Sequence, residues 1–87
     1  MNTFHLIIAS PDGNLFDSDA KGVSLRGTEG DLAILAGHIP FITAVRPCEC
    51  EITLPDNTVK TAKVESGILS VADNVTTLLS GSFEFTA

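Results

Sequence analysis

The residues best suited to chemistry in this chain are its two histidines. His5 alternates with apolar neighbours, so it is expected on the polar face of a strand, in contact with solvent. His38 stands between Gly37 and Ile39-Pro40, and a constrained loop of this kind can fix an imidazole in place. A general base also needs an orienting partner and a nucleophile. Neither accompanies His38 in the sequence, so a structural or interface role is the stronger interpretation.

Two cysteines are the next candidates. Cys48 and Cys50 are separated by one residue, so in an extended segment their side chains point the same way. A disulfide closing so short a loop would be strained, which predicts free thiols in a reducing compartment, one of them packed as a small apolar residue. The histidines could complete a metal site with them, but the spacing matches no compact zinc motif. We expect no metal.

The acidic and glycine-rich segments suggest no cofactor. Asp17 and Asp19 flank Ser18 and could hold calcium weakly, although a solvated turn is the plainer interpretation. Residues 27–30, Gly-Thr-Glu-Gly, resemble half of a phosphate-binding loop, but no Gly-Lys-Ser/Thr follows. Glu29 and Asp31 would also repel phosphate. The sequence therefore contains no recognisable catalytic set, and we expect a protein that is not an enzyme.

The composition predicts the elements that position these residues. Val, Ile and Thr number 22 of 87 residues, and branched side chains suit strands better than helices. Seven Gly and four Pro divide the chain into short pieces, and no long amphipathic helix can be traced. Without room for crossover helices the strands must be mainly antiparallel. We predict an all-β fold, a single β-sandwich domain or flattened barrel over residues 1–87.

Alternation within the pieces supports this fold. Apolar residues recur at positions 4, 6 and 8 and at positions 50, 52 and 54, while turn signals occur at 10–13, 55–57 and 73–74. The short apolar run at residues 32–35, between Gly30 and Gly37, predicts a strand buried on both faces. Counted in this way, the chain has eight to ten short strands.

Charge and hydropathy exclude several classes of protein. Five Lys and Arg against eleven Asp and Glu give a net charge of −6, which argues against nucleic acid and anionic lipid as partners. No apolar run approaches the roughly 20 residues of a membrane span, and the first nine residues lack the cations of a secretory signal. A mean hydropathy of +0.29 in so small a chain predicts apolar surface exposed to a partner protein.

Three segments together resemble one family. Residues 27–41, GTEGDLAILAGHIPF, look like the signature segment of the epsilon subunit of F-type ATP synthase. Residues 4–8 with the turn at 10–13 are similar to that family's first strand, and residues 66–71 with 74–76 are similar to a later part. The segments keep the family's order and spacing over nearly the whole chain.

The resemblance implies a ten-stranded β-sandwich in the central stalk of the enzyme, a non-catalytic rotor subunit that couples ion translocation to ATP synthesis. Its partners would be the gamma subunit and the polar loops of the c-ring, without direct insertion into the membrane, at the cytoplasmic face of the bacterial inner membrane in the F1 sector. The positions matching Ser10, His38 and Thr43 would face gamma. Those matching Glu29, Gly30 and Asp31 would face the c-ring.

This sequence also departs from the family pattern. Ala33 and Ala36 stand where the family usually has Gly and Pro, and residues 48–50 replace a stretch that usually carries Gly. The family's helical hairpin, which supplies inhibition of hydrolysis and in some members ATP binding, would begin where this chain stops, so we expect neither activity. Two alternatives stay open: a free-standing β-sandwich that binds a ligand or acts as an adaptor, and a thiol or metal enzyme built on Cys48, Cys50 and His38.

Overall fold

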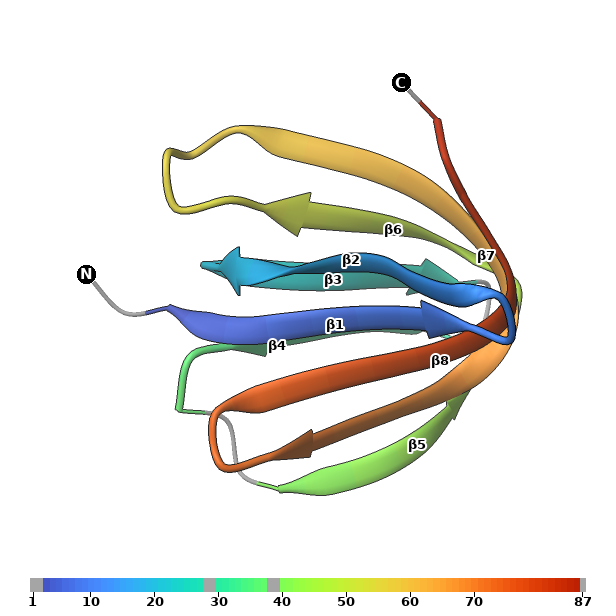
Figure 1. The fold of residues 1–87 in the computed structure, drawn as a ribbon, viewed down its shortest axis with the longest axis horizontal. Helices are drawn as coiled ribbons and strands as arrows, with labels where there is room; N and C mark the ends of the chain where they lie inside the picture. Colours follow the sequence, from blue (N-terminus) through green and yellow to red (C-terminus); the bar gives the residue numbers. More distant parts are fainter. Residues whose placement is uncertain (1–2, 28–29, 38–39, 87) are drawn as a thin grey trace.

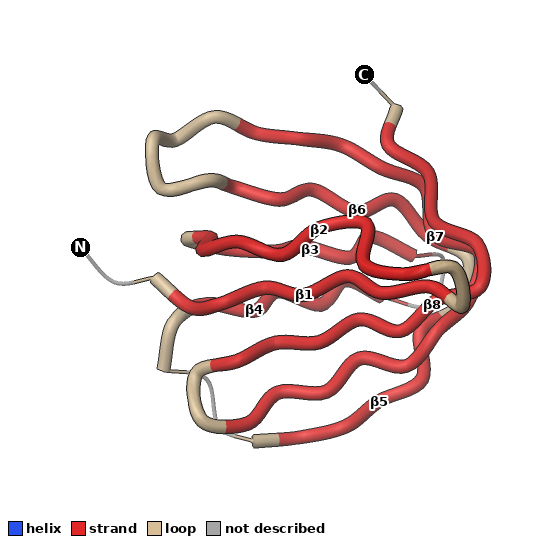
Figure 2. Tube along the Cα trace, in the orientation of Figure 1, coloured by secondary structure: helices blue, strands red, loops and turns tan. Residues whose placement is uncertain are grey.

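The computed structural model describes residues 3–27, 30–37 and 40–86, and every regular element in them is a strand (Figures 1 and 2). The strands are β1 (Phe4–Ser10), β2 (Gly13–Ala20), β3 (Gly22–Gly27), β4 (Gly30–Leu35), β5 (Phe41–Val45), β6 (Cys48–Thr53), β7 (Val59–Ala72) and β8 (Val75–Phe85). Over these residues the chain forms no helix long and apolar enough to cross a membrane. The predicted all-β class is confirmed.

The strands form two layers that share β7 and β8. Residues 59–64 of β7 pair with β6, whereas residues 67–71 pair with β5. In the same way, residues 75–79 of β8 pair with β1, and residues 82–85 pair with the first part of β7. Layer I therefore consists of β2, β1, the first part of β8, the second part of β7, and β5. Layer II consists of β4, β3, β6 and the remaining parts of β7 and β8 (Figure 1).

The number of strands differs from the ten that the family resemblance implies. The described residues contain eight, because β7 and β8 are 14 and 11 residues long and each runs through both layers without a break. If each is counted once per layer, the layers hold five strand segments apiece. Each long strand contains a Ser-Gly pair, at residues 66–67 and 80–81, which is typical of a turn, but here the strand continues through it, because a bend is enough to change layers.

Gly67 and Ser80 build this bend. Pairing between β7 and β8 shifts register around Ser66, and a Cβ atom on Gly67 would overlap the carbonyl oxygen of Leu79. The buried Ser80 hydroxyl lies 2.5 Å from the Ser66 carbonyl oxygen and accepts the backbone N–H of Ser82 at 3.1 Å. Gly67 thus lets the two backbones approach each other, and the Ser80 hydroxyl bonds backbone groups that the irregular ladder leaves without a partner.

The core fills the space between the layers. Its buried residues come from both layers, as the alternation predicts: Phe4, Leu6, Ile8, Ala20, Val23, Leu25, Ile34, Val45, Cys50, Ile52, Ala62, Val64, Leu69, Val71 and Leu78. The prediction that residues 32–35 are buried on both faces is wrong. Among the described strands, β4 pairs with β3 alone and lies at the edge of its layer. Its Ile34 is buried, but Ala33 is exposed and Leu35 is 63% exposed.

Pairing is mainly antiparallel, as predicted, with one exception. β1 and β8 run parallel, and the chain between them is long enough to make the required crossover without a helix. Asn74, in the turn before β8, holds the start of this pair: its side-chain amide donates to the Thr3 carbonyl at 2.9 Å, and its backbone carbonyl accepts the His5 N–H at 3.1 Å. Its side-chain oxygen also accepts the Gly37 N–H at 3.2 Å.

Candidate functional site

The outer face of layer I carries a row of apolar side chains that crosses the strands. The register aligns Ala44 of β5 with Ile68 of β7, Leu79 of β8 and Ala9 of β1. Leu15, at the bulge where β2 pairs with β1, extends the row to the far edge. Ile68 and Leu79 are 51% and 53% exposed. We call these five residues the apolar row: Ala44, Ile68, Leu79, Ala9 and Leu15.

A surface hollow of about 360 Å³ lies beside Leu79 and Ala9 of the row. The hollow is lined by Ala9, Ser10, Pro11, Leu79, Ser80 and Gly81. Both of its hydroxyls are engaged within the protein, because Ser10 Oγ bonds the Gly13 carbonyl at 3.1 Å and Ser80 bonds the bend. None of these six lining residues is charged, so the surface that they form suits an apolar group.

Charge divides unevenly between the two layers. The strand segments of layer I (residues 4–10, 13–20, 41–45, 67–72 and 75–79) contain no Lys or Arg. The strand cations Arg26, Lys60 and Lys63 all belong to layer II, where Arg26 pairs with Glu51 at 3.3 Å. Layer I therefore presents apolar surface bordered by acid, and layer II presents mixed charge.

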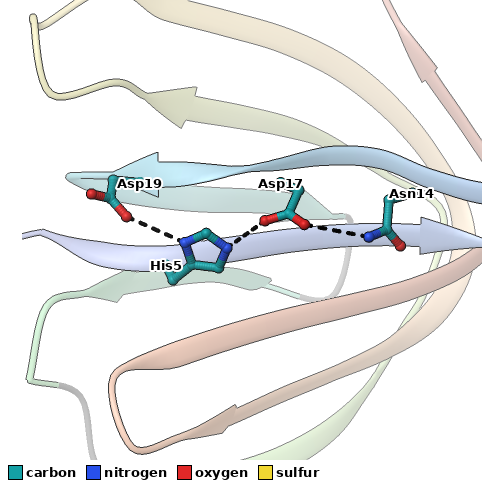
Figure 3. Close-up of polar contacts among 4 residues, drawn as sticks. All are labelled: His5, Asn14, Asp17 and Asp19. Carbon is teal, nitrogen blue, oxygen red and sulfur yellow. Dashed lines mark hydrogen bonds and ion pairs between the residues drawn. The ribbon is translucent and has the colours of Figure 1, made fainter.

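Asp17 and Asp19 form the acid border of layer I, and a histidine contacts both of them (Figure 3). His5 on β1 lies between Asp17 and Asp19 on β2: its Nε2 bonds Asp17, and its Nδ1 is 3.2 Å from Asp19 Oδ1. The hydrogen bond to Asp17, followed by that to Asp19, raises the pKa of His5 above 6.5. The predicted solvated His5 thus has two specific partners, and the carboxylates weighed for calcium instead bind an imidazole.

Comparison with known proteins places this two-layer fold. A family model for the "ATP synthase, Delta/Epsilon chain, beta-sandwich domain" matches residues 3–86. The chain belongs to this family.

Individual relatives agree with the family. The chain is similar to an ATP synthase epsilon chain of Delftia acidovorans, with 36% identity over 80 residues that cover 92% of this chain and 58% of that protein. It thus spans less than two thirds of that curated relative. It also resembles a chain of the Euglena gracilis mitochondrial ATP synthase, with a TM-score of 0.88 and 17% identity. That match covers 98% of this chain and 54% of the Euglena chain. It resembles a chain of the Tetrahymena thermophila mitochondrial ATP synthase with a TM-score of 0.73 and 13% identity. That match covers 91% of this chain and 63% of the Tetrahymena chain. At such identities the two structures establish the fold alone.

Two of the residues that the resemblance assigns to gamma lie in layer I of this epsilon-family sandwich. Ser10 ends β1 at the hollow, and Thr43 lies in the edge strand β5. Thr43 is level with Ile8 across three strand spacings, about 14 Å. The Thr43 side chain is on the inward side of β5, with Leu69 opposite. His38 lies outside the described residues.

Two of the three residues assigned to the c-ring, Gly30 and Asp31, lie in layer II. Gly30 and Asp31 begin β4, and Asp31 is exposed opposite Arg26 of β3. This end of the β3–β4 hairpin adjoins Cys48 and lies at the same end of the sandwich as the Ser10 turn, where β7 and β8 change layer (Figure 1). Glu29 lies outside the described residues. Of the predicted interface residues that the structure describes, Ser10 and Thr43 are therefore in layer I, and Gly30 and Asp31 are in layer II.

The cysteines behave as the spacing predicts. Both are free; Cys50 is fully buried in the core, and Cys48 is half-buried on the same side of β6. Burial raises the pKa of the Cys50 thiol to about 12, and burial also raises that of Cys48. Thiols of this kind are poor nucleophiles. Within residues 3–27, 30–37 and 40–86, no three His, Cys, Asp or Glu side chains gather in a way that could hold a metal.

The sequence reasoning anticipated exposed apolar surface but not the residues that make it. Ile42 is 75% exposed on the same face as Ile68 and Leu79, one row away from the apolar row. The alternating pattern assigns these residues to the outward side of their strands and does not show that this side is apolar. A strand that is apolar on both sides would indicate an exposed apolar face. Residues 41–45 have that pattern, because every position but Thr43 is apolar.

Proposed function

We propose that this chain is the sandwich part of a non-catalytic rotor subunit of an F-type ATP synthase. In this role it connects the gamma subunit to the polar loops of the c-ring, so that ion translocation is coupled to ATP synthesis. The match of the family model to residues 3–86 carries the proposal. The subunit would be peripheral, at the cytoplasmic face of the bacterial inner membrane.

The arrangement of the two layers supports a protein with two partners. Layer I carries Ser10, Thr43 and the apolar row, whereas layer II carries Gly30 and Asp31. A coupling subunit needs two surfaces that can be occupied together, and residues on separate layers meet that need. We propose gamma as the partner of layer I, with His38 in the same interface, and the c-ring as the partner of the hairpin that contains Glu29, Gly30 and Asp31.

A ligand-binding module is less well supported by the aromatic residues. Carbohydrate and small-ligand modules present aromatic platforms, and this chain has five Phe and no Trp or Tyr. Phe4 is buried, and Phe16, Phe41 and Phe83 pack against the core. Phe85 makes an edge-to-face contact with Phe83, with ring centroids 5.1 Å apart. None of the five belongs to the outer face of layer I.

Titration of the chain against gamma, or against an epsilon-depleted F1 complex from the same source, tests the proposal. We expect saturable one-to-one binding by calorimetry, weakened in His38→Ala. Absence of binding to a folded partner would overturn the proposal.

The ring-facing surface is tested in the reconstituted enzyme. Asp31→Lys should reduce ion-driven ATP synthesis more than it reduces hydrolysis by detached F1, and Asp73→Lys, at the opposite end of the sandwich, is the matched control. Equal loss of both activities in Asp31→Lys would contradict a ring-facing hairpin.

A further inference from the structure

We propose that the outer face of layer I binds an amphipathic segment of its partner, which lies along the apolar row, inserts one large apolar side chain into the hollow beside Gly81 and directs basic residues at Asp17 and Asp19. The inference rests on the proposed function, in which this partner is the gamma subunit. It adds the chemistry and direction of the segment that docks.

The apolar row fixes the direction. Its residues are aligned across five neighbouring strands, so the row runs perpendicular to them. Four spacings between strands make it about 19 Å long. A helix rises about 1.5 Å per residue, so some 13 residues of helix would cover it. A helix of that length presents apolar residues three and four apart on one side, which is the pattern that a narrow apolar row selects.

The hollow supplies an anchor point. Its walls are the apolar atoms of Ala9, Pro11 and Leu79, and Gly81 leaves it open because that residue has no side chain. A Cβ atom built on Gly81 meets nothing within 4 Å, so the space in front of it is unfilled. Because the Ser10 and Ser80 hydroxyls already bond the backbone, a polar occupant would find few free partners. An apolar side chain that fills such a pocket commonly dominates the energy of an interface.

Charge supplies the second part of the partner's chemistry. Asp17 is level with Ile7 on the outer face, one row, or about 7 Å, from the apolar row. Asp19 follows it at the level of His5. The strand segments of layer I hold no Lys or Arg, and the titratable groups that these segments contain are His5, Asp17 and Asp19. The neighbouring β8 presents Val75 and Thr77 beside them. An acidic border of this kind is complementary to a segment with Lys or Arg beside its apolar side.

The test fills the hollow without altering the fold. Gly81→Leu places a side chain in open space, and its backbone lies outside the left-handed region that would require glycine. The matched control is Ser24→Leu, which adds the same side chain to the outer face of layer II. Each variant is titrated into gamma or epsilon-depleted F1 after its circular dichroism and melting temperature have been compared with wild type.

We expect Gly81→Leu to weaken binding by roughly tenfold or more, and Ser24→Leu to leave it unchanged. Leu79→Ser, which removes an exposed side chain from the row, should weaken binding similarly and decides the matter if Gly81→Leu does not fold. Asp17→Asn with Asp19→Asn should lower affinity and flatten its dependence on salt, whereas Glu49→Gln on layer II should do neither.

The outcomes separate the two proposals. Wild-type binding with full affinity retained in folded Gly81→Leu or in Leu79→Ser overturns the anchor and leaves the rotor function standing. Salt dependence unchanged by the two Asn substitutions overturns the basic character of the segment. Failure of the wild-type chain to bind overturns the proposed function together with this inference.

Discussion

Thr76 offers a stabilising substitution that follows directly from its surroundings. It lies on the inward side of β8, between Val71 of β7 and Leu6 of β1, and is 1% exposed. Its hydroxyl is buried and has no hydrogen-bond partner among the described residues. Buried polar groups are almost always paired, so this one costs free energy in the folded state. Thr76→Val replaces the hydroxyl by a methyl group of similar size and keeps the branched shape that strands favour.

The magnitude follows from the cost of burying an unpaired hydroxyl. That cost is about 1–3 kcal/mol in mutational data, so we expect Thr76→Val to raise the free energy of unfolding by about 1.5 kcal/mol. In a domain of this size 1 kcal/mol shifts the melting temperature by roughly 4–8 °C, which predicts an increase of roughly 6–12 °C. Thr76→Ser keeps the hydroxyl and deletes a buried methyl, so it should lower stability by about 1 kcal/mol.

Thermal and urea denaturation followed by circular dichroism would measure both changes. Thr77→Val is the matched control, because Thr77 is the next residue on β8 and is half-buried on the outer face; its effect should lie within about 0.5 kcal/mol. A loss of stability in Thr76→Val, at unchanged urea dependence, would refute the reasoning, since it would mean that the hydroxyl is hydrogen-bonded in solution.

Three further predictions concern a charge, a backbone contact and a thiol. His5→Gln should lower the melting temperature at acidic pH, and the difference from wild type should vanish as pH rises through the raised pKa of His5. The reason is that a group with a raised pKa in the folded state stabilises the fold fully below pH 6.5 and less above it. A difference in melting temperature that stays constant with pH would contradict this. Gly67→Ala should lower the free energy of unfolding in urea by roughly 1–3 kcal/mol, because the added Cβ would overlap the backbone of Leu79. Gly81→Ala should leave that free energy nearly unchanged, and equal effects of the two substitutions would count against the bend. Iodoacetamide at pH 8, followed by mass spectrometry, should modify Cys48 before Cys50, which should react only in denaturant; equal rates in the folded chain would disprove its burial.

Local patterns were enough to predict the class of fold and most of the core. The alternation at residues 4, 6 and 8 and at 50 and 52 identifies inward positions correctly, because a strand with one buried face can satisfy its apolar residues in a single register. The run at 32–35 was misread, since an apolar stretch does not reveal whether its strand is central or at an edge. That distinction depends on pairing between distant segments.

The candidate surface depended on the same distant pairings. The turn signal at 10–13 predicts that β1 pairs with β2, but not the contact of His5 with Asp17, because a bulge shifts the register between Ile8 and Ala9. The apolar row could not be predicted either, since Ile68 and Leu79 meet Ala9 only through the register of β8 on β1. The bend at Gly67 leaves a Ser-Gly pair in each long strand as its local signal, and such a pair is equally typical of a turn. The family resemblance supplied Ser10 and Asp31, but neither the hollow nor the acid border.

The parallel pairing of β1 with β8 has a consequence for how the chain acquires its structure. β1 is a central strand of layer I, yet one of its two neighbours comes from the opposite end of the described chain. During synthesis the hairpin of β1 and β2 can form early, but the other edge of β1 has no strand to pair with until β8 has emerged from the ribosome. Folding should therefore be slow for so small a domain and close in one late step, with the nascent hairpin exposed to chaperones until then.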